Sequence, residues 1–307
     1  MDSGKQNLLL KVTTYFAVLN GVIILILKLY GYVNTNSSAI FASLVDAALD
    51  ITSSLMNMFA LRFALVPPDA NHRFGHDKIQ DLAAFAQGIF FIISGLFVLV
   101  VSIYKSSYHQ EMTSSEIGIN TILISTILNL CLVAFQTYVL NKVKSPLIHV
   151  DRFHYLTDIL TNIVVIISLY LSSSYAFLDS FMGIGIAIYI IHGAYSIIHE
   201  ALHHLLDEEA PDTDKHQIIE VLKKYKSLNQ IIAVHDLKTR IAGNKYFIQF
   251  HVELDGNLKL YETHAITENI EKDIIKIFPG SQIIIHQDPV GVDEDTPYRD
   301  ELNTEPN

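Results

Sequence analysis

The sequence has little cysteine and little charge. Its 307 residues include a single cysteine, and only 17% of them are charged, whereas 50% are hydrophobic. One cysteine excludes an intrachain disulfide. Because Cys131 lies in an apolar run, we expect it to be a buried small side chain rather than a metal ligand. The scarcity of charge is typical of a polytopic membrane protein with a modest soluble portion.

Basic residues are outnumbered in the C-terminal third. Residues 1–206 carry 12 acidic and 10 basic side chains, and residues 207–307 carry 20 and 11, so the net charges are −2 and −9. An acidic segment repels phosphates, which argues against nucleic acid as a partner and favours cations. The N-terminus lacks a cleavage-site pattern, so we expect no signal peptide and interpret the first apolar segment as a span.

Six stretches are long enough to cross a lipid bilayer, which requires about 20 mostly apolar residues. They lie at residues 12–32, 38–64, 80–104, 116–140, 148–171 and 177–200, and they predict a helical transmembrane domain over residues 1–206. Basic residues gather in the segments after the second and fourth stretches: Arg62, Arg73, Lys78, Lys142, Lys144 and Arg152. The positive-inside rule therefore predicts that both termini are cytoplasmic.

After Pro211 the pattern becomes that of a soluble domain. Apolar residues at helical spacing predict helices at 212–225 and 261–278, and β-type runs predict strands at 231–240, 246–254 and 281–287. This α-β-β-α-β order predicts a cytoplasmic α/β domain over residues 207–289. Residues 290–307 are polar and acidic, and we expect them to be disordered.

Two predicted spans contain pairs of ionisable side chains spaced i,i+4, so both members of a pair project from one helix face. The pairs are Asp46 with Asp50 and His154 with Asp158. A carboxylate at mid-bilayer costs about 2.5–3.5 kcal/mol on insertion scales. Lys28 is the only basic residue within a core span, so ion pairing cannot neutralise three such carboxylates. By contrast, Asp151 and Arg152 lie near a predicted interface, where we expect them to be solvated.

These four groups have the chemistry of a divalent metal site. Three carboxylates and an imidazole on two packed helices match the ligands of a tetrahedral ion, and the nitrogen ligand favours Zn²⁺ over Mg²⁺ or Ca²⁺. Without a thiolate, binding should be weak enough for a carrier. Since His and Asp bind metal when deprotonated, protons and metal compete for the site, which predicts metal/proton antiport.

Two further clusters of metal ligands occur outside the predicted spans. Asp69, His72 and His76 lie in the loop PPDANHRFGH at 67–76, and Asp77 could supplement them. Solvated loop histidines are the alternative interpretation. The predicted soluble domain carries the second cluster: His235, His251, His264, His286 and Asp288. Adjacent strands could bring three of these histidines together, with the aspartate bridging two ions.

Taken together, these motifs resemble the cation diffusion facilitator family, and more closely its bacterial zinc and iron efflux branch. The resemblance rests on SLVDAALD (43–50), PPDANHRFGHDK (67–78), HYLTD (154–158), HQD (286–288) and the histidines at 235, 251 and 264. It covers nearly the whole chain. It implies a homodimeric, proton-coupled metal exporter of the inner membrane, with the intramembrane quartet as the transport site.

The resemblance also implies roles for the other residues. The loop cluster matches a lower-affinity site, and the cytoplasmic cluster matches a dinuclear centre at the dimer contact that regulates transport. Lys78 and Asp207 match an interlock of charges between subunits. Zn²⁺ is the expected ion, and Fe²⁺, Cd²⁺, Mn²⁺ and Co²⁺ stay open as alternatives.

Two other functions would use similar residues. A membrane metalloenzyme could use the paired histidines His72 and His76, but the chain lacks the H-E-x-x-H motif and an identifiable base beside an open metal position. A metal sensor that does not transport could keep the cytoplasmic histidines. It would have no reason to keep Asp46, Asp50 and Asp158 inside a bilayer.

Overall fold

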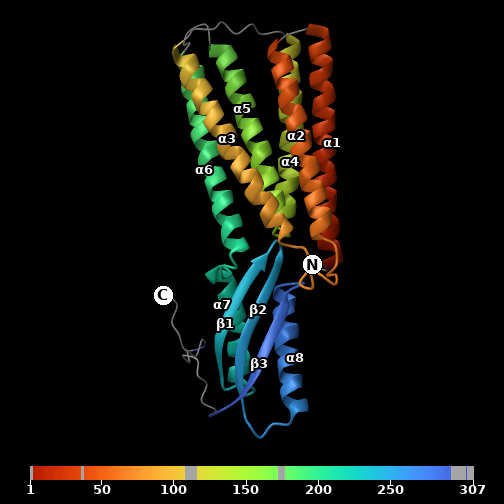
Figure 1. Cartoon of the computed structure of the whole chain (residues 1–307), viewed down its shortest axis with the longest axis vertical. Helices are drawn as coiled ribbons and strands as arrows, with labels where there is room; N and C mark the ends of the chain where they lie inside the picture. The colour runs from red at the N-terminus through yellow and green to blue at the C-terminus, as the bar shows by residue number, and fades with distance from the viewer. Residues whose placement is uncertain (1–2, 36–37, 108–115, 172–176, 292–301, 303–307) are drawn as a thin grey trace. The chain divides into compact units, whose positions relative to one another are not determined.

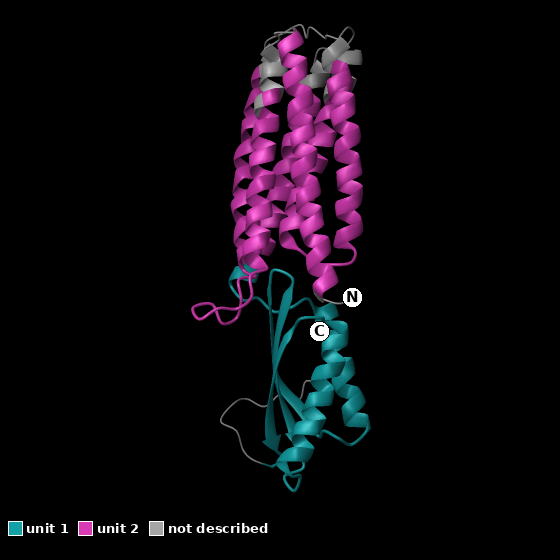
Figure 2. Cartoon of the chain, turned by 90° about the vertical axis from the view of Figure 1, so that its right-hand side faces the viewer, with its two compact units in different colours: residues 1–3, 203–307 teal, residues 4–202 magenta. Residues whose placement is uncertain are grey.

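The computed structural model describes residues 3–35, 38–107, 116–171, 177–291 and 302. The chain divides into two compact units, one of residues 4–202 and the other of residues 203–307 together with 1–3 (Figure 2). The predicted polar tail at 290–307 lies mostly outside the described residues. One of its members that is described, Leu302, is buried in the core of the second unit.

The first unit is built from long helices (Figure 1). Their bounds are α1 Ser3–Thr35, α2 Ser38–Ala64, α3 Ile79–Ser107, α4 Glu116–Leu140, α5 Pro146–Leu171 and α6 Phe177–Leu205, so each overlaps one predicted span. Within the described residues, α1, α3, α4 and α6 contain segments long and apolar enough to cross a membrane. In the described part of the chain, α2 and α5 do not reach this limit, and both carry predicted metal ligands.

Helix α5 contributes to each of three apolar clusters in this unit. Val150 packs with residues of α3 and α6, Leu147 and Ile148 pack with residues of α1, α2 and α4, and Tyr155 packs between α1 and α4. Close approach of α6 depends on Gly193, because a Cβ atom there would overlap the ring of Phe153. The helix that carries His154 and Asp158 is therefore packed on several sides.

The prediction that Cys131 is buried was wrong. Cys131 is exposed on α4, and nearby Leu130 and Ile127 are 50% and 59% exposed. Lipid tails are as apolar as a leucine side chain, so the outer surface of a membrane helix bundle carries apolar residues as readily as its interior does. An apolar run therefore does not indicate which of its residues face inward.

The second unit is an α/β domain with the predicted order of elements. It comprises α7 Asp212–Ser227, β1 Ala233–Ala242, β2 Lys245–Leu254, α8 Leu260–Ile277 and β3 Gln282–Pro289. Strand β2 is central, pairing antiparallel with β1 and parallel with β3. Alternate residues of β2, from Tyr246 to Leu254, join apolar residues of α7 and α8 in one core. The other face of the sheet carries the histidines.

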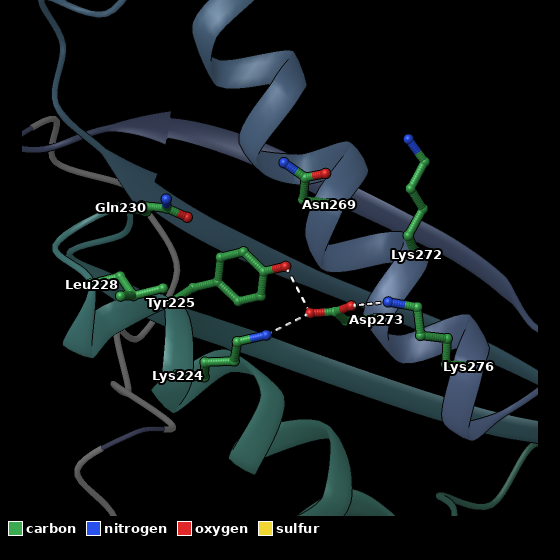
Figure 3. A pocket seen from close by; sticks show the side chains of 8 residues that line it. All are labelled: Lys224, Tyr225, Leu228, Gln230, Asn269, Lys272, Asp273 and Lys276. Carbon is green, nitrogen blue, oxygen red and sulfur yellow. Dashed lines mark hydrogen bonds and ion pairs between the residues drawn. The ribbon is translucent and has the colours of Figure 1, made fainter.

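An ion-pair cluster joins α7 to α8 away from these histidines. The Asp273 carboxylate accepts hydrogen bonds from Lys224 and Tyr225, both at 2.9 Å, and from Lys276 at 2.7 Å (Figure 3). These residues border a cavity of about 290 Å³. The three donors, with the Lys276 ammonium first, lower the pKa of Asp273. Burial, and then the bond to Asp273, raise the pKa of Tyr225 to about 12.

Candidate metal sites

Helices α2 and α5 bring three predicted metal ligands together inside the helical unit. The Nε2 atom of His154 lies 3.0 Å from Oδ1 of Asp50 and 3.8 Å from Oδ2 of Asp158. The three side chains are 12%, 21% and 29% exposed, respectively. The ring of Phe91 stacks on the imidazole with centroids 5.6 Å apart. One imidazole nitrogen therefore faces two carboxylates in a largely buried setting.

This geometry fits a divalent ion. At metal–ligand distances of about 2.0 Å, the ligand atoms of a tetrahedral site lie about 3.3 Å apart. The two observed separations, 3.0 and 3.8 Å, lie on either side of that value. The Oδ2 atom of Asp158 is buried and has no hydrogen-bond partner among the described residues. A buried carboxylate oxygen without a hydrogen bond is costly unless a cation compensates it.

Asp46 is the fourth predicted ligand of this site. It lies one helical turn before Asp50 on α2 and is exposed. It does not belong to the three residues whose ligand atoms lie within 4.8 Å of one another. Its role as a ligand stays a prediction.

Asp151 is buried, and the prediction that it is solvated was wrong. It is 4% exposed and accepts hydrogen bonds from Nδ2 of Asn57 at 2.9 Å and from Nε2 of Gln136 at 2.7 Å. Gln87 donates in turn to the side-chain oxygen of Asn57. Asn57 of α2 and Gln136 of α4 thus supply hydrogen bonds to the Asp151 carboxylate, which explains how this group can be buried away from water.

A second polar contact joins the same helices next to His154. The hydroxyl groups of Ser54 and Tyr155 are 2.8 Å apart, and both residues are buried. Ser54 follows Asp50 by one turn of α2, and Tyr155 follows His154 directly. The relative position of the metal ligands on α2 and α5 is therefore fixed by buried hydrogen bonds. Sequence reasoning missed these partners, for which the only signal was polar residues within apolar runs.

The loop after α2 brings Asp69, His72 and His76 together. Asp69 lies 3.2 Å from Nδ1 of His72 and 3.4 Å from Nε2 of His76. The backbone N–H of His72 donates to the Asp69 carboxylate at 2.6 Å, and this bond is the main cause that lowers the pKa of Asp69. The other nitrogen of His76 lies 3.3 Å from the carbonyl oxygen of Val66, which orients the ring. Asp77 is not a member of this group.

The α/β unit, residues 203–307 with 1–3, aligns three predicted ligands in one row across its sheet. His235 of β1 is paired in register with His251 of β2, which is paired in register with His286 of β3. The ring centroids are 5.0 and 4.6 Å apart along the row. Cross-strand neighbours at this spacing interact directly. The strand register thus creates a cluster from residues far apart in the sequence.

Asp288 extends this row at the end of β3. Its Oδ2 atom lies 2.9 Å from Nδ1 of His251 and 3.7 Å from Nε2 of His235, and its Oδ1 atom lies 3.1 Å from Nε2 of His286. Each carboxylate oxygen thus faces a different set of imidazoles, as an aspartate that bridges two ions requires. His264, on α8, is exposed and is not part of the three-residue group His235, His251 and Asp288. Its contribution stays a prediction.

The predicted interlock residues lie in different units. Asp207 pairs with Arg240 in the cytoplasmic unit, with Nη1 of the guanidinium 3.2 and 3.3 Å from its two carboxylate oxygens. Lys78 directly precedes α3, and its carbonyl accepts the N–H of Leu82 at 3.0 Å. An interlock between subunits stays a prediction.

Residue types that bind metals converge in both units, between helices in one and on the sheet in the other. Comparison with known proteins identifies the family. Residues 13–206 match the cation efflux transmembrane domain, and residues 210–290 match the cytoplasmic domain of cation efflux proteins. The chain therefore belongs to the cation diffusion facilitator family, whose members are cation efflux transporters and not enzymes.

Relatives match over almost the whole chain. Protein p34 of Rickettsia rickettsii is 43% identical over 300 residues, which cover 98% of this chain and 99% of the relative. The cation-efflux pump FieF of Salmonella arizonae is 37% identical over 270 residues, which cover 88% and 89%. A solved structure of CzrB in its zinc form is 33% identical; it covers 29% of this chain and 98% of that one, with a TM-score of 0.27. The two family matches and the match to FieF support efflux of divalent metal cations.

Proposed function

We propose that this chain exports Zn²⁺ from the cytoplasm in exchange for protons. It acts as a homodimer in the inner membrane, with both termini in the cytoplasm. The observation that carries the proposal is the convergence of Asp50, His154 and Asp158 on one point between α2 and α5. A mixed nitrogen and oxygen ligand set suits Zn²⁺ and similar ions better than Mg²⁺ or Ca²⁺. The likeness to the cation-efflux pump FieF supports export of cations.

Proton exchange follows from the chemistry of the ligands. His154 binds a metal ion only when its Nε2 atom is deprotonated, and both aspartates bind as carboxylates. In the described geometry the imidazole already lies at hydrogen-bond distance from Asp50, so a proton can replace the metal between these groups. When the site faces protons at high concentration, the protons displace the metal ion.

The cytoplasmic cluster serves regulation in this proposal. His235, His251, His286 and Asp288 would hold resident Zn²⁺, with a carboxylate oxygen of Asp288 facing each side of the row. The bound ions neutralise part of an acidic unit and thereby bias the dimer toward transport. Deleting residues 209–307, with the helices still folded, should remove the dependence of transport on cytoplasmic metal.

Metal flux in proteoliposomes tests the transport proposal. Purified protein is reconstituted with an imposed pH gradient, and Zn²⁺, Fe²⁺, Cd²⁺ and Mn²⁺ are compared. We expect the gradient to drive Zn²⁺ flux, and we expect Asp50→Ala to abolish it. Thr52→Ala is the matched control, because Thr52 lies on the same helix, is exposed, and donates its hydroxyl hydrogen to the carbonyl of Ala48 within that helix. Zn²⁺ flux that does not depend on the pH gradient would refute antiport. Full Zn²⁺ flux by Asp50→Ala would refute the proposed site between α2 and α5.

A further inference from the structure

Strand β1 is irregular directly after its metal-site histidine. The pairing with β2 shifts between His235 and Lys238. Asp236 and Leu237 there oppose a single residue of β2, Phe250, which makes this position a β-bulge. Leu237 packs against the core of the unit. Bulges bend a strand and redirect side chains, and they are frequent next to functional sites.

The bulge places Asp236 in an unusual backbone conformation. Its φ angle is 52°, in the left-handed region, which aspartate and asparagine tolerate better than most residues. Its Oδ2 atom lies 2.7 Å from Nζ of Lys238 and 3.8 Å from Nε2 of His251. The carboxylate is therefore on the histidine side of the sheet, although alternation along a regular strand would place it opposite His235.

The imidazole of His251 consequently lies between two carboxylates. Its Nδ1 atom is 2.9 Å from Asp288, on the side of the metal-ligand group, and its Nε2 atom faces Asp236 on the other side. Asp236 does not belong to the group of His235, His251 and Asp288, whose ligand atoms lie within 4.8 Å of one another. Its position is that of a residue beside a ligand rather than of a ligand.

We infer that Asp236 accepts the Nε2–H of His251 and thereby fixes Nδ1 as the nitrogen that faces the metal. The inference rests on the cytoplasmic metal site proposed above. Histidines that bind metals usually donate their other ring N–H to a carboxylate or carbonyl, which sets the tautomer and raises the basicity of the ligand nitrogen. The present separation of 3.8 Å is an ion-pair distance, so we expect the contact to shorten when His251 binds an ion.

Zinc binding to the full-length chain in detergent tests this role. The protein carries Asp50→Ala and His72→Ala, so that calorimetric titration with Zn²⁺ reports the cytoplasmic site. We expect Asp236→Gly to weaken zinc binding by about 10–100-fold without changing the number of bound ions. Glycine keeps the left-handed backbone, so the fold should persist. Asp236→Asn retains an acceptor oxygen and should restore most of the affinity.

Two matched controls separate the role from general effects. Asn229→Gly removes a side chain from another position with positive φ, 54°, and should leave zinc binding unchanged. Lys238→Met removes the other partner of Asp236 and should have a smaller effect than Asp236→Gly. In a His251→Ala background, Asp236→Gly should have no further effect, because its partner is gone.

Four results would overturn the inference. In the first, Asp236→Gly binds zinc as tightly as the parent protein. In the second, Asp236→Gly binds one ion fewer, which would make Asp236 a ligand. In the third, Asp236→Gly weakens zinc binding by the same factor in the His251→Ala background. The fourth is a parent protein that binds no Zn²⁺ in this titration. That result would refute the cytoplasmic site as well, whereas the first three leave the site in place.

Discussion

Asp151 offers the most direct test of which contacts hold the helices around the proposed transport site in place. Replacing it with leucine removes two buried hydrogen bonds, from Asn57 and Gln136, which join α5 to α2 and α4. Interhelical hydrogen bonds in membrane proteins contribute about 0.6–1.7 kcal/mol each, so the variant should lose about 1–3 kcal/mol of stability. Since His154 follows Asp151 by one helical turn, we also expect weaker metal binding at the transport site.

Asp151→Asn is the matched comparison. The Oε1 atom of Gln136 is buried and has no hydrogen-bond partner in the part of the chain that the structure describes, so flipping this amide lets an asparagine keep both bonds. We expect Asp151→Asn to lose less stability than Asp151→Leu, measured as the midpoint of thermal unfolding in detergent. Zinc titration of the same samples measures the effect on the site. Equal midpoints for wild type and Asp151→Leu would refute the reasoning.

Two further predictions concern packing and pH. Gly193→Ala places a methyl group against the ring of Phe153 and should destabilise the helical unit by about 1–3 kcal/mol, as overpacking does. Gly185→Ala is the control on the same helix. Its added Cβ atom would meet no described atom within 4 Å, so this variant should not lower the midpoint of thermal unfolding. The raised pKa of Tyr225, about 12 in the folded state against about 10 when unfolded, stabilises the protein below about pH 10, and this contribution is lost as the pH rises to 12. The stability difference between wild type and Tyr225→Phe should therefore narrow across that window in denaturant titrations, and a constant difference would contradict the assignment.

The sequence could predict the helices, and which of their ionisable residues share a face, because both signals are local. Long apolar runs mark the helices, and the i,i+4 spacing places His154 and Asp158 on one face of α5. The adjacency of α2 and α5 is not local. It depends on buried contacts such as Ser54 with Tyr155, between residues 101 positions apart.

Burial of polar residues was harder to predict. Asp151 lies five residues inside α5, where hydropathy alone indicates a water-facing end. The hydrogen bonds to its carboxylate come from Asn57 and Gln136, which belong to two other helices. Hydropathy scores each segment alone, so it registers the cost of a polar group without the partner that offsets it. Hydropathy also did not reveal that Cys131 faces outward, because apolar residues occur on the outer surface of a membrane helix bundle as readily as inside it.

In the cytoplasmic unit, alternation predicted the strands but not their register. The row of His235, His251 and His286 requires two separate pairings, one antiparallel and one parallel. A slip of one residue in either pairing would move a histidine to the opposite face. The bulge at Asp236 has no recognisable pattern in the sequence, because it appears only once the partner strand is known.

The in-register row has a consequence for how the protein spaces its imidazoles. Successive imidazoles lie on adjacent strands. The interval between strands, about 4.8 Å, is determined by main-chain hydrogen bonds that every amino acid except proline can make. Mutation can change which side chain occupies each position of the row, but it does not change the distance between neighbouring strands. The connecting turns can therefore lengthen or shorten during evolution while the spacing of the imidazoles stays constant.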